Sequence, residues 1–473
     1  MHHRIAVLGL LLGTLPLAAE DAPWATYRGN ARRTGNTDNI PGPTASPAVV
    51  WAMKSTGHFV ASPVPVGDQL LFSAIGALNR PEVFTLAATP KNPTDIRPTW
   101  SKSQPLPKLP TVSSAAVSDG KIILGEGMHQ TDGADLYCLP ADGSTLLWAL
   151  SVPGELVHME GSPAVANGKV YVGGGSAGVI CVELDAVTLD GKEMTVKDVP
   201  ALQAAHMKKL RAAYEVDKKK DPDFARAPGD GDLLRPSPKK VWAQGEKRWH
   251  VDAPILVAGD KVLAASEFLD KEKLGERALF CLDANTGKEL CKAPLTYNPW
   301  SGPSLAGDTV IVTTSSISYD PKLVEGAKGE VVAIELATGK EKWKKNLPGG
   351  ALGCAAVTAD AAVFTATDGK VRAFSLKDGS RVSIYDAKDC FFAPPAVVGD
   401  IAYVPDCKGV VHAVNWKTGA AIWTFDLGKD PLKSPGMNYG GITVHGGKLF
   451  LATCNIEGPF ARQPTVVVCL GTK

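Results

Sequence analysis

The stretch Gly161-Ser-Pro-Ala-Val-Ala-Asn-Gly-Lys-Val-Tyr-Val172 sets the pattern on which most of the chain is built. Two small residues open it, an aliphatic residue stands fifth, an Asn-Gly pair follows, and an apolar run closes it. Because Gly, Asn and Asp tolerate the positive φ of a two-residue hairpin turn, the stretch predicts two antiparallel strands. The pattern fits without gaps at seven more windows, which start at Ala61, Ser113, Ala253, Ser301, Gly353, Ala393 and Gly440.

The spacing of these eight windows predicts the fold. Neighbouring windows start roughly 40–52 residues apart, and one four-stranded propeller blade takes about that length. We therefore expect an all-β fold, an eight-bladed β-propeller of four-stranded antiparallel blades over residues 46–473. The interval from Gly161 to Ala253 is about twice as long, which predicts an insertion over residues 192–238.

The insertion is expected to contain a helix, because residues 200–217 are rich in helix-forming residues. Five of its residues form an apolar stripe at helical spacing, namely Leu202, Ala205, Leu210, Ala213 and Tyr214. The stripe favours a helix that packs on its own blade. An arm that docks a partner is the alternative.

The N-terminal region predicts export. Residues 1–19 combine an early arginine, an apolar stretch and two alanines, as a signal peptide does, and residues 20–45 form an extension. No cysteine follows the apolar stretch, so no lipid anchor is expected, and no later stretch is apolar enough to cross a membrane. We expect a periplasmic or secreted protein. The segment Val49-Val-Trp-Ala52 is predicted to complete the last blade and so close the ring.

Two side-chain types recur from blade to blade. Tryptophan recurs in the outer strand, at Trp51, Trp100, Trp148, Trp242, Trp343 and Trp423, with Cys291 in the same place in one repeat. A large ring repeated in this way is expected to fill the wedge between blades. Cysteine recurs in an inner slot (Cys138, Cys181, Cys281 and Cys469) where sister repeats have alanine, which predicts packing. Cys390 and Cys407 flank one hairpin and are the pair that we expect to be bridged.

Charge and motifs give no indication of nucleic-acid binding, membrane binding or a known catalytic motif. Fifty basic residues against 49 acidic ones give no electrostatic reason to expect nucleic acid or an anionic membrane as partner. The glycine-rich run 173–178 lies between two predicted strands, so we interpret it as a hairpin connection and not as a catalytic or phosphate-binding loop. The histidines show no repeated metal-ligand spacing. No catalytic residue and no metal are predicted from motifs.

The residues that precede the eight windows are expected to meet at one mouth of the propeller axis. Two carboxylates and three aromatic rings stand directly before windows, and polar side chains stand one or two residues further back. This set predicts an axial binding site: His158, Glu160, His250, Asp252, Asn298, Trp300, Phe392, Asn438 and Tyr439. The alternative is that the three aromatic rings only plug the channel.

The strands Ala-Thr-Gly-Lys-Glu-Lys-Trp343 and Lys-Thr-Gly-Ala-Ala-Ile-Trp423, with the eightfold repeat, resemble the quinoprotein-like, or PQQ-like, eight-bladed β-propellers of bacteria. The resemblance covers roughly residues 46–473. That family includes pyrroloquinoline-quinone (PQQ) dehydrogenases and the cofactor-free outer-membrane-assembly protein BamB, so the resemblance implies a fold and not one activity. The adjacent cysteine pair typical of the alcohol dehydrogenases and the lipid-modified cysteine typical of BamB are both missing here.

We expect a BamB-like binding or scaffold module of the cell envelope, monomeric, with no cofactor and no catalysis of its own. It would present the axial mouth to a protein, peptide or carbohydrate. The alternative implied by the resemblance is a PQQ- and calcium-dependent alcohol or sugar dehydrogenase. In that case Glu160, Asp252 and Asn298 would hold calcium and Trp300 would stack on the quinone.

Overall fold

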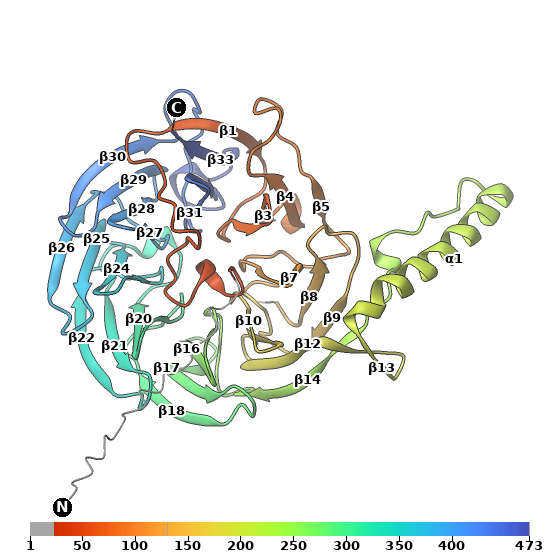
Figure 1. The fold of residues 1–473 in the computed structure, drawn as a ribbon, viewed down its shortest axis with the longest axis horizontal. Coiled ribbons are helices and arrows are strands. Elements are labelled where there is room, and N and C mark those ends of the chain that lie inside the picture. The colour runs from red at the N-terminus through yellow and green to blue at the C-terminus, as the bar shows by residue number, and fades with distance from the viewer. Residues whose placement is uncertain (1–22, 130, 473) are drawn as a thin grey trace, which may run out of the picture.

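Eight β-sheets surround a central axis in the computed structural model (Figure 1). The structure describes residues 23–129 and 131–472, and the predicted signal peptide lies outside this part. Each of the eight sequence windows forms the two innermost strands of one sheet. The eight-bladed propeller predicted from the hairpin spacing is therefore confirmed.

We number the blades 1 to 8 by the order of their windows. Blades 1 to 4 contain the strands β2 (Val64–Val66), β3 (Gln69–Ile75), β4 (Pro81–Ala87), β5 (Trp100–Lys102); β6 (Ala116–Ser118), β7 (Lys121–Gly125), β8 (Ala134–Pro140), β9 (Trp148–Val152); β10 (Ala164–Ala166), β11 (Lys169–Gly173), β12 (Val179–Leu189), β13 (Lys192–Thr195), β14 (Ser237–Gln244); and β15 (Leu256–Ala258), β16 (Lys261–Leu269), β17 (Leu274–Asp283), β18 (Glu289–Pro294). Blades 5 to 8 contain β19 (Ser304–Ala306), β20 (Thr309–Ser315), β21 (Gly329–Glu335), β22 (Glu341–Leu347); β23 (Ala356–Val357), β24 (Ala361–Ala366), β25 (Lys370–Ser375), β26 (Arg381–Asp386); β27 (Ala396–Val398), β28 (Ile401–Pro405), β29 (Val410–Asn415), β30 (Ala420–Asp426); and β31 (Thr443–His445), β32 (Lys448–Ala452), β33 (Thr465–Gly471) with β1 (Ala48–Ser55).

The ring closes in blade 8, where the two ends of the propeller share one sheet. Strand β1 pairs antiparallel with β33, with Trp51 opposite Cys469 and Lys54 opposite Val466. This pairing covers the edge that β33 would otherwise expose. The predicted N-terminal closing strand is confirmed.

The recurring tryptophans join neighbouring blades. Trp343 of blade 5 donates its indole N–H to the carbonyl of Leu376 in blade 6 at 2.9 Å, and its ring lies against Gly379. A Cβ at Gly379 would come within 2.7 Å of that ring, so the turn needs glycine there. Trp51, Trp100, Trp148 and Trp242 make the same kind of hydrogen bond to the next blade. These rings are structural wedges, as their repetition predicts.

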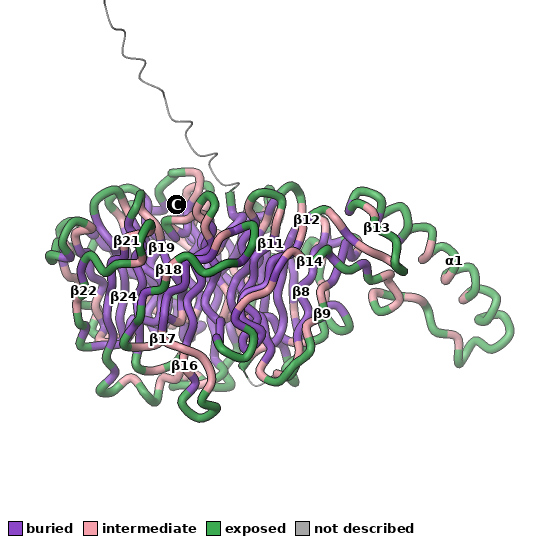
Figure 2. Tube along the Cα trace, turned by 90° about the horizontal axis from the view of Figure 1, so that it is seen from below, coloured by how far each residue is buried: buried purple, intermediate pink, exposed green. Residues whose placement is uncertain are grey.

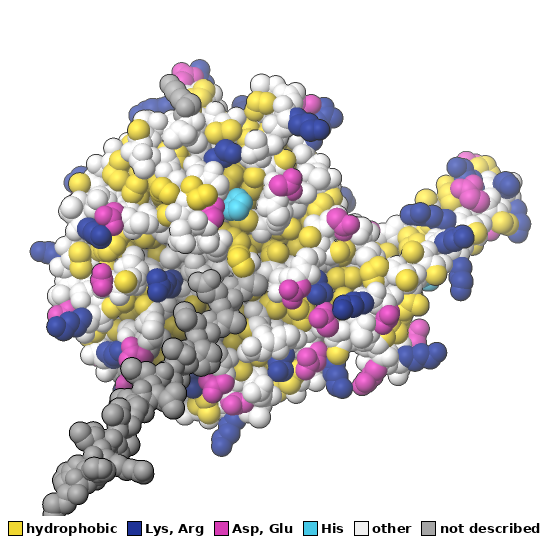
Figure 3. Space-filling model, in the orientation of Figure 1, with side chains coloured by type: hydrophobic (Ala, Val, Ile, Leu, Met, Phe, Trp, Pro, Cys, Tyr) yellow, Lys and Arg dark blue, Asp and Glu magenta, His cyan; other side chains and the backbone are white. Residues whose placement is uncertain are grey.

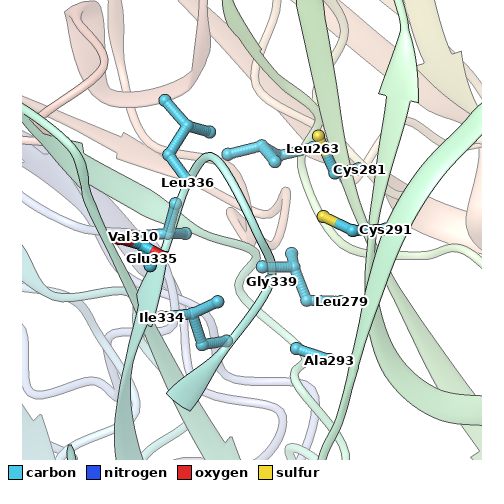
Figure 4. A pocket seen from close by; sticks show the side chains of 10 residues that line it. All are labelled: Leu263, Leu279, Cys281, Cys291, Ala293, Val310, Ile334, Glu335, Leu336 and Gly339. Atoms are coloured by element: carbon cyan, nitrogen blue, oxygen red, sulfur yellow. The ribbon is translucent and has the colours of Figure 1, made fainter. Parts of the chain in front are cut away.

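Blade 4 lacks this tryptophan, and a small pocket lies in its place (Figure 4). Cys291 stands opposite Cys281 on the paired strands, in the register that six other blades fill with tryptophan and blade 6 fills with Ser383. Both sulfurs face the pocket, which also borders Gly339 and Leu336 of blade 5 (Figure 4). The pocket is thus the space that an indole would occupy.

The cysteines correct one expectation. All nine lie in the described residues and all are free thiols, including Cys390 and Cys407, which we expected to be bridged. These two thiols lie side by side, and a hydrogen bond from Cys407 lowers the pKa of Cys390. The recurring-slot cysteines are buried in the blades, as packing residues are.

The insertion forms an arm that projects beyond the rim (Figures 1 and 2). It contains β13 and the helix α1 (Val199–Lys220), and only Val199 and Gln203 of the helix are buried. The expected packing of the apolar stripe on its blade is therefore wrong: Leu202 is 38 % exposed, and Ala205 and Ala213 are also exposed. Lys and Arg side chains are spread along the arm (Figure 3). Within the described residues, neither α1 nor any other helix has the length and apolarity of a membrane span.

The N-terminal extension closes one end of the axis. Residues 24–36, which include the 3-10 turn η1 (Tyr27–Gly29), lie at the centre of the ring (Figure 1). Six carbonyl groups of this plug segment accept N–H bonds of 2.7–2.9 Å from the fifth residue of six windows: Val117, Val165, Leu305, Val357, Val397 and Val444. The first window has Pro65 at this position, and proline has no N–H to donate.

Two buried arginines fix the plug segment to four blades. Arg28 donates to the carbonyls of Pro395 and Ile442, both at 2.8 Å. Arg33 donates to the carbonyls of Pro303 at 3.1 Å and Ile255 at 2.9 Å. Each of the four acceptors is the third residue of its window. The two guanidinium groups therefore bind the same backbone position in four blades.

Candidate functional site

The predicted mouth lies at the other end of the axis from the plug segment. The plug binds the fifth residue of the windows, whereas the mouth residues stand just before the first. The plug also binds the carbonyl of the third residue in four windows, which lies about three residues (~10 Å) from the mouth positions. Any ligand of the mouth therefore approaches from this side of the propeller.

One half of the mouth is a polar cluster built by blades 2, 3 and 4. We define it as His129, His158, Glu160, His250, Asp252 and Glu267. His158 and His250 are fully buried, and their Nε2 atoms lie 2.9 Å and 3.0 Å from the two oxygens of Asp252. The backbone N–H of Asp252 donates to Oε2 of Glu267 at 3.1 Å. The structure thus brings four predicted residues, His158, Glu160, His250 and Asp252, into one network.

Burial and mutual charge shift the protonation of this cluster. Burial, followed by the charge of Asp252, raises the pKa of Glu160 to about 7. Burial likewise raises the pKa of Glu267 well above its usual range. Burial would lower the pKa of His158, but the Asp252 carboxylate raises it to about 9. Three carboxyl groups therefore share a site in which only Asp252 is held firmly ionised, with its pKa kept low by the two imidazoles.

Two members of the polar cluster were missed by sequence reasoning. His129 lies in the loop after β7, and its N–H donates to Oε1 of Glu160. Glu267 lies near the end of β16, the second strand of its hairpin. The sequence could have indicated Glu267. The second strand of each hairpin runs antiparallel to the first, so its last residues return to the mouth, where the first strand begins. His129 carried no such signal, since its loop has no repeat.

The other half of the mouth is an aromatic cluster, defined as Trp300, Tyr319, Phe392 and Tyr439. Phe392 is fully buried, and its ring lies 5.3 Å from Tyr439 and 5.9 Å from Tyr319, centroid to centroid. Trp300 and Tyr439 remain half-buried, and the Trp300 indole donates to the carbonyl of Ile317 at 2.8 Å. Sequence reasoning missed Tyr319, whose pKa is raised by burial and, further, by the nearby Tyr27 of the plug segment and Cys354.

The two predicted asparagines point away from the polar cluster. Asn298 accepts from Arg277 Nε and from the N–H of Phe268, both at 3.0 Å, and donates to the carbonyl of Phe268. Asn438 is buried and donates to the carbonyl of Asp406 at 3.4 Å. Asn298 therefore joins strands β16 and β17, and Asn438 supports the turn that follows β28.

This arrangement bears on the calcium and quinone that the PQQ-like resemblance implies. Calcium prefers oxygen ligands, but the oxygen of Asn298 is engaged by a guanidinium and a backbone N–H. Both oxygens of Asp252 face imidazole nitrogens. The set Glu160, Asp252 and Asn298 therefore does not fit a calcium centre.

Comparison with known proteins places the chain in a family. The family model described as "Outer membrane protein assembly factor BamB" matches residues 43–199, 232–382 and 281–455. The chain belongs to the BamB family. No curated protein sequence matches it.

Solved structures share the fold. BamB from Moraxella catarrhalis is 14% identical with a TM-score of 0.58, over 91% of this chain and 98% of that one. A europium-containing methanol dehydrogenase is 14% identical with a TM-score of 0.57, over 94% and 97%. A quinohemoprotein alcohol dehydrogenase from Comamonas testosteroni is 11% identical with a TM-score of 0.61, over 96% and 82%. At these identities the likeness shows the propeller fold alone.

Proposed function

We propose that this member of the BamB family is a non-catalytic binding module of the cell envelope, and that it holds a protein or peptide partner at the mouth described above. The envelope location is supported by the signal-like residues 1–19 and by the family description. Neither bears on what the mouth binds. That part of the proposal is supported by the geometry of the mouth.

One observation supports this proposal most. The polar cluster and the aromatic cluster lie side by side at the mouth, while the plug segment closes the opposite end of the axis. Trp300 and Tyr439 are half-buried rings that offer flat apolar area, and Glu160 is a half-buried carboxyl group beside them. Aromatic anchors with a few adjoining polar groups are typical of the centre of a binding interface. Loops of several blades surround this end, so a peptide segment would contact many of them at once.

A double variant tests the proposal. We expect Asp252→Ala with Trp300→Ala to weaken binding of the envelope partner at least ~30-fold, because loss of even one hot-spot side chain costs ~2 kcal/mol. The wild-type chain would first recover the partner from native envelope extract, and binding of that partner to each purified variant would then be measured.

The matched control lies on the arm. Tyr214→Ala with Lys218→Ala removes an aromatic ring and a charge that lie 5.5 Å apart on α1, far from the axis. This control is expected to bind like the wild type. Full binding by the mouth variant would overturn the proposal, and so would equal loss in the arm variant. Recovery of a glycan in place of a protein would redirect it to a carbohydrate ligand.

The dehydrogenase alternative is tested separately. Adding PQQ with calcium to the purified chain is expected to give no saturable quinone uptake and no dye-linked alcohol oxidation. Stoichiometric uptake with turnover that Glu160→Gln abolishes would contradict the non-catalytic proposal.

A further inference from the structure

Four side chains from three neighbouring blades each bring a metal-binding atom into one small region of the polar cluster. His129 follows β7 in blade 2, His158 precedes β10 in blade 3, and His250 and Asp252 precede β15 in blade 4. Their ligating atoms all lie within 4.8 Å of one another. Among the residues that the structure describes, no other group of three or more His, Cys, Asp or Glu side chains meets this criterion.

The donors of this group are fixed in direction as well as in place. His158 and His250 are fully buried, and their ring centroids are 5.1 Å apart at an interplanar angle of 64°. Each ring turns Nε2 to a different oxygen of Asp252, at 2.9 Å and 3.0 Å. Two imidazoles therefore already converge on one carboxylate.

The surroundings of this point are rich in acceptors and poor in cations. Glu160 and Glu267 adjoin Asp252, and Oε1 of the fully buried Glu267 has no hydrogen-bond partner in the described chain. Within residues 23–129 and 131–472, the second nitrogens of His158 and His250 are also buried without a hydrogen-bond partner. Buried polar atoms without a partner are costly, and a bound cation would give the free Glu267 oxygen an electrostatic partner.

We propose that His129, His158, His250 and Asp252 bind a divalent first-row transition-metal ion at the axial mouth, with zinc the best match. Three imidazole nitrogens and one carboxylate oxygen are ligands that zinc takes in tetrahedral sites, whereas calcium and magnesium take oxygen donors. Copper and nickel also accept imidazole, so they compete for the same donors. The site joins blades 2, 3 and 4 and is independent of any partner of the mouth.

Binding requires only a small rearrangement. A tetrahedral zinc ion with bonds of ~2.0–2.1 Å holds its ligand atoms about 3.3 Å apart, slightly wider than the present Nε2–Asp252 distances. His129 supplies the remaining adjustment, because its side chain is exposed while the other three ligands are buried. Its ring centroid lies 5.7 Å from that of His158 and 6.2 Å from that of His250.

Metal titration of the purified full chain tests the proposal without any partner. After dialysis against a chelator, zinc would be titrated calorimetrically, and cobalt(II) would be added as a probe whose visible absorption reports its coordination. We expect one ion per chain and a tetrahedral cobalt spectrum. His158→Gln and His250→Gln are expected to weaken zinc binding at least ~100-fold, since each removes a direct ligand.

His412 provides the matched control. Its Nε2 lies 3.1 Å from Asp406 in a buried pair, but it is one imidazole without companions. His412→Gln should leave zinc affinity unchanged. If the buried variants fail to fold, His129→Gln on the exposed loop is used in their place and should weaken binding in the same way. Absence of zinc and cobalt binding, full affinity in the ligand variants, or a loss as large in His412→Gln would overturn the proposal.

Discussion

Arg28 and Arg33 show how single side chains can organise a ring of blades. Both are fully buried, both have positive φ angles (61° and 57°), and their guanidinium groups bind backbone carbonyls of four blades. Burial lowers the pKa of Arg33 to about 10, so this side chain stays protonated at neutral pH. A buried cation that replaces its water shell with carbonyl oxygens is stable only while all of them stay in place.

We predict that Arg33→Ala lowers the free energy of unfolding by about 3 kcal/mol, because it leaves the carbonyl of Pro303 without its donor and removes one of the two donors to the carbonyl of Ile255. Arg32→Ala is the control, since the Arg32 side chain is exposed in the same segment and only its carbonyl contacts a blade. Urea denaturation of the two variants measures the difference. Equal stability of both would contradict the role given to Arg33.

The sequence predicted side chains whose position follows from the repeat, and missed those that depend on how distant segments meet. His158 and Asp252 were found because they stand at fixed offsets before a hairpin. His129 joins them only through the path of an irregular loop. Arg28 and Arg33 lie outside the repeat, so nothing in the pattern indicates that their segment enters the axis. The sequence predicts hairpin turns from local residue types. It does not predict which distant side chains meet at the axis, because that depends on how the ring closes.

At the scale of one blade, the pocket beside Cys291 offers a test of the tryptophan wedge. Trp148 and Trp242 already stand opposite cysteines in their blades, so Cys281 leaves room for an indole at the equivalent place. We predict that Cys291→Trp stabilises the fold by about 1 kcal/mol, because cavity filling commonly adds ~0.5–2 kcal/mol. Thermal unfolding would show this as a higher Tm.

The control for this change is Cys291→Phe, which fills the same pocket but has no N–H. In the sister blades the indole donates to the carbonyl before the turn, which corresponds to Leu336 here. The tryptophan variant should therefore be the more stable of the two. A Tm below that of the wild type in both variants would show that the pocket is too small for a ring.

The arm is an element that the propeller does not need for stability. Only Val199 and Gln203 of α1 are buried, and Gln203 bonds to the backbone of Leu146 and Leu234 at the rim. We predict that replacing residues 207–228 with a short Gly-Ser linker changes the free energy of unfolding by less than ~1 kcal/mol, as is typical of exposed positions. Chemical denaturation of the shortened chain checks this, and insoluble or molten protein would contradict it.

The whole molecule combines a closed end and an open end on one axis. The plug segment ties the windows together from one side, the pairing of β1 with β33 closes the ring, and the Trp423 indole at the seam donates to the carbonyl of Pro43 in the extension. The extension that closes the axis therefore also accepts the hydrogen bond of the blade 7 tryptophan. What remains accessible at the axis is the mouth, where His129 is exposed and Glu160, Trp300 and Tyr439 are half-buried.

Site-specific photo-crosslinking in the native host tests most directly whether the mouth is where this molecule binds. A photoreactive phenylalanine would replace Tyr439 at the mouth or Tyr214 on the arm. We predict one defined protein adduct from position 439 and none of that mass from position 214. An adduct from position 214 alone, or no adduct at 439 while the chain is folded and exported, would contradict it.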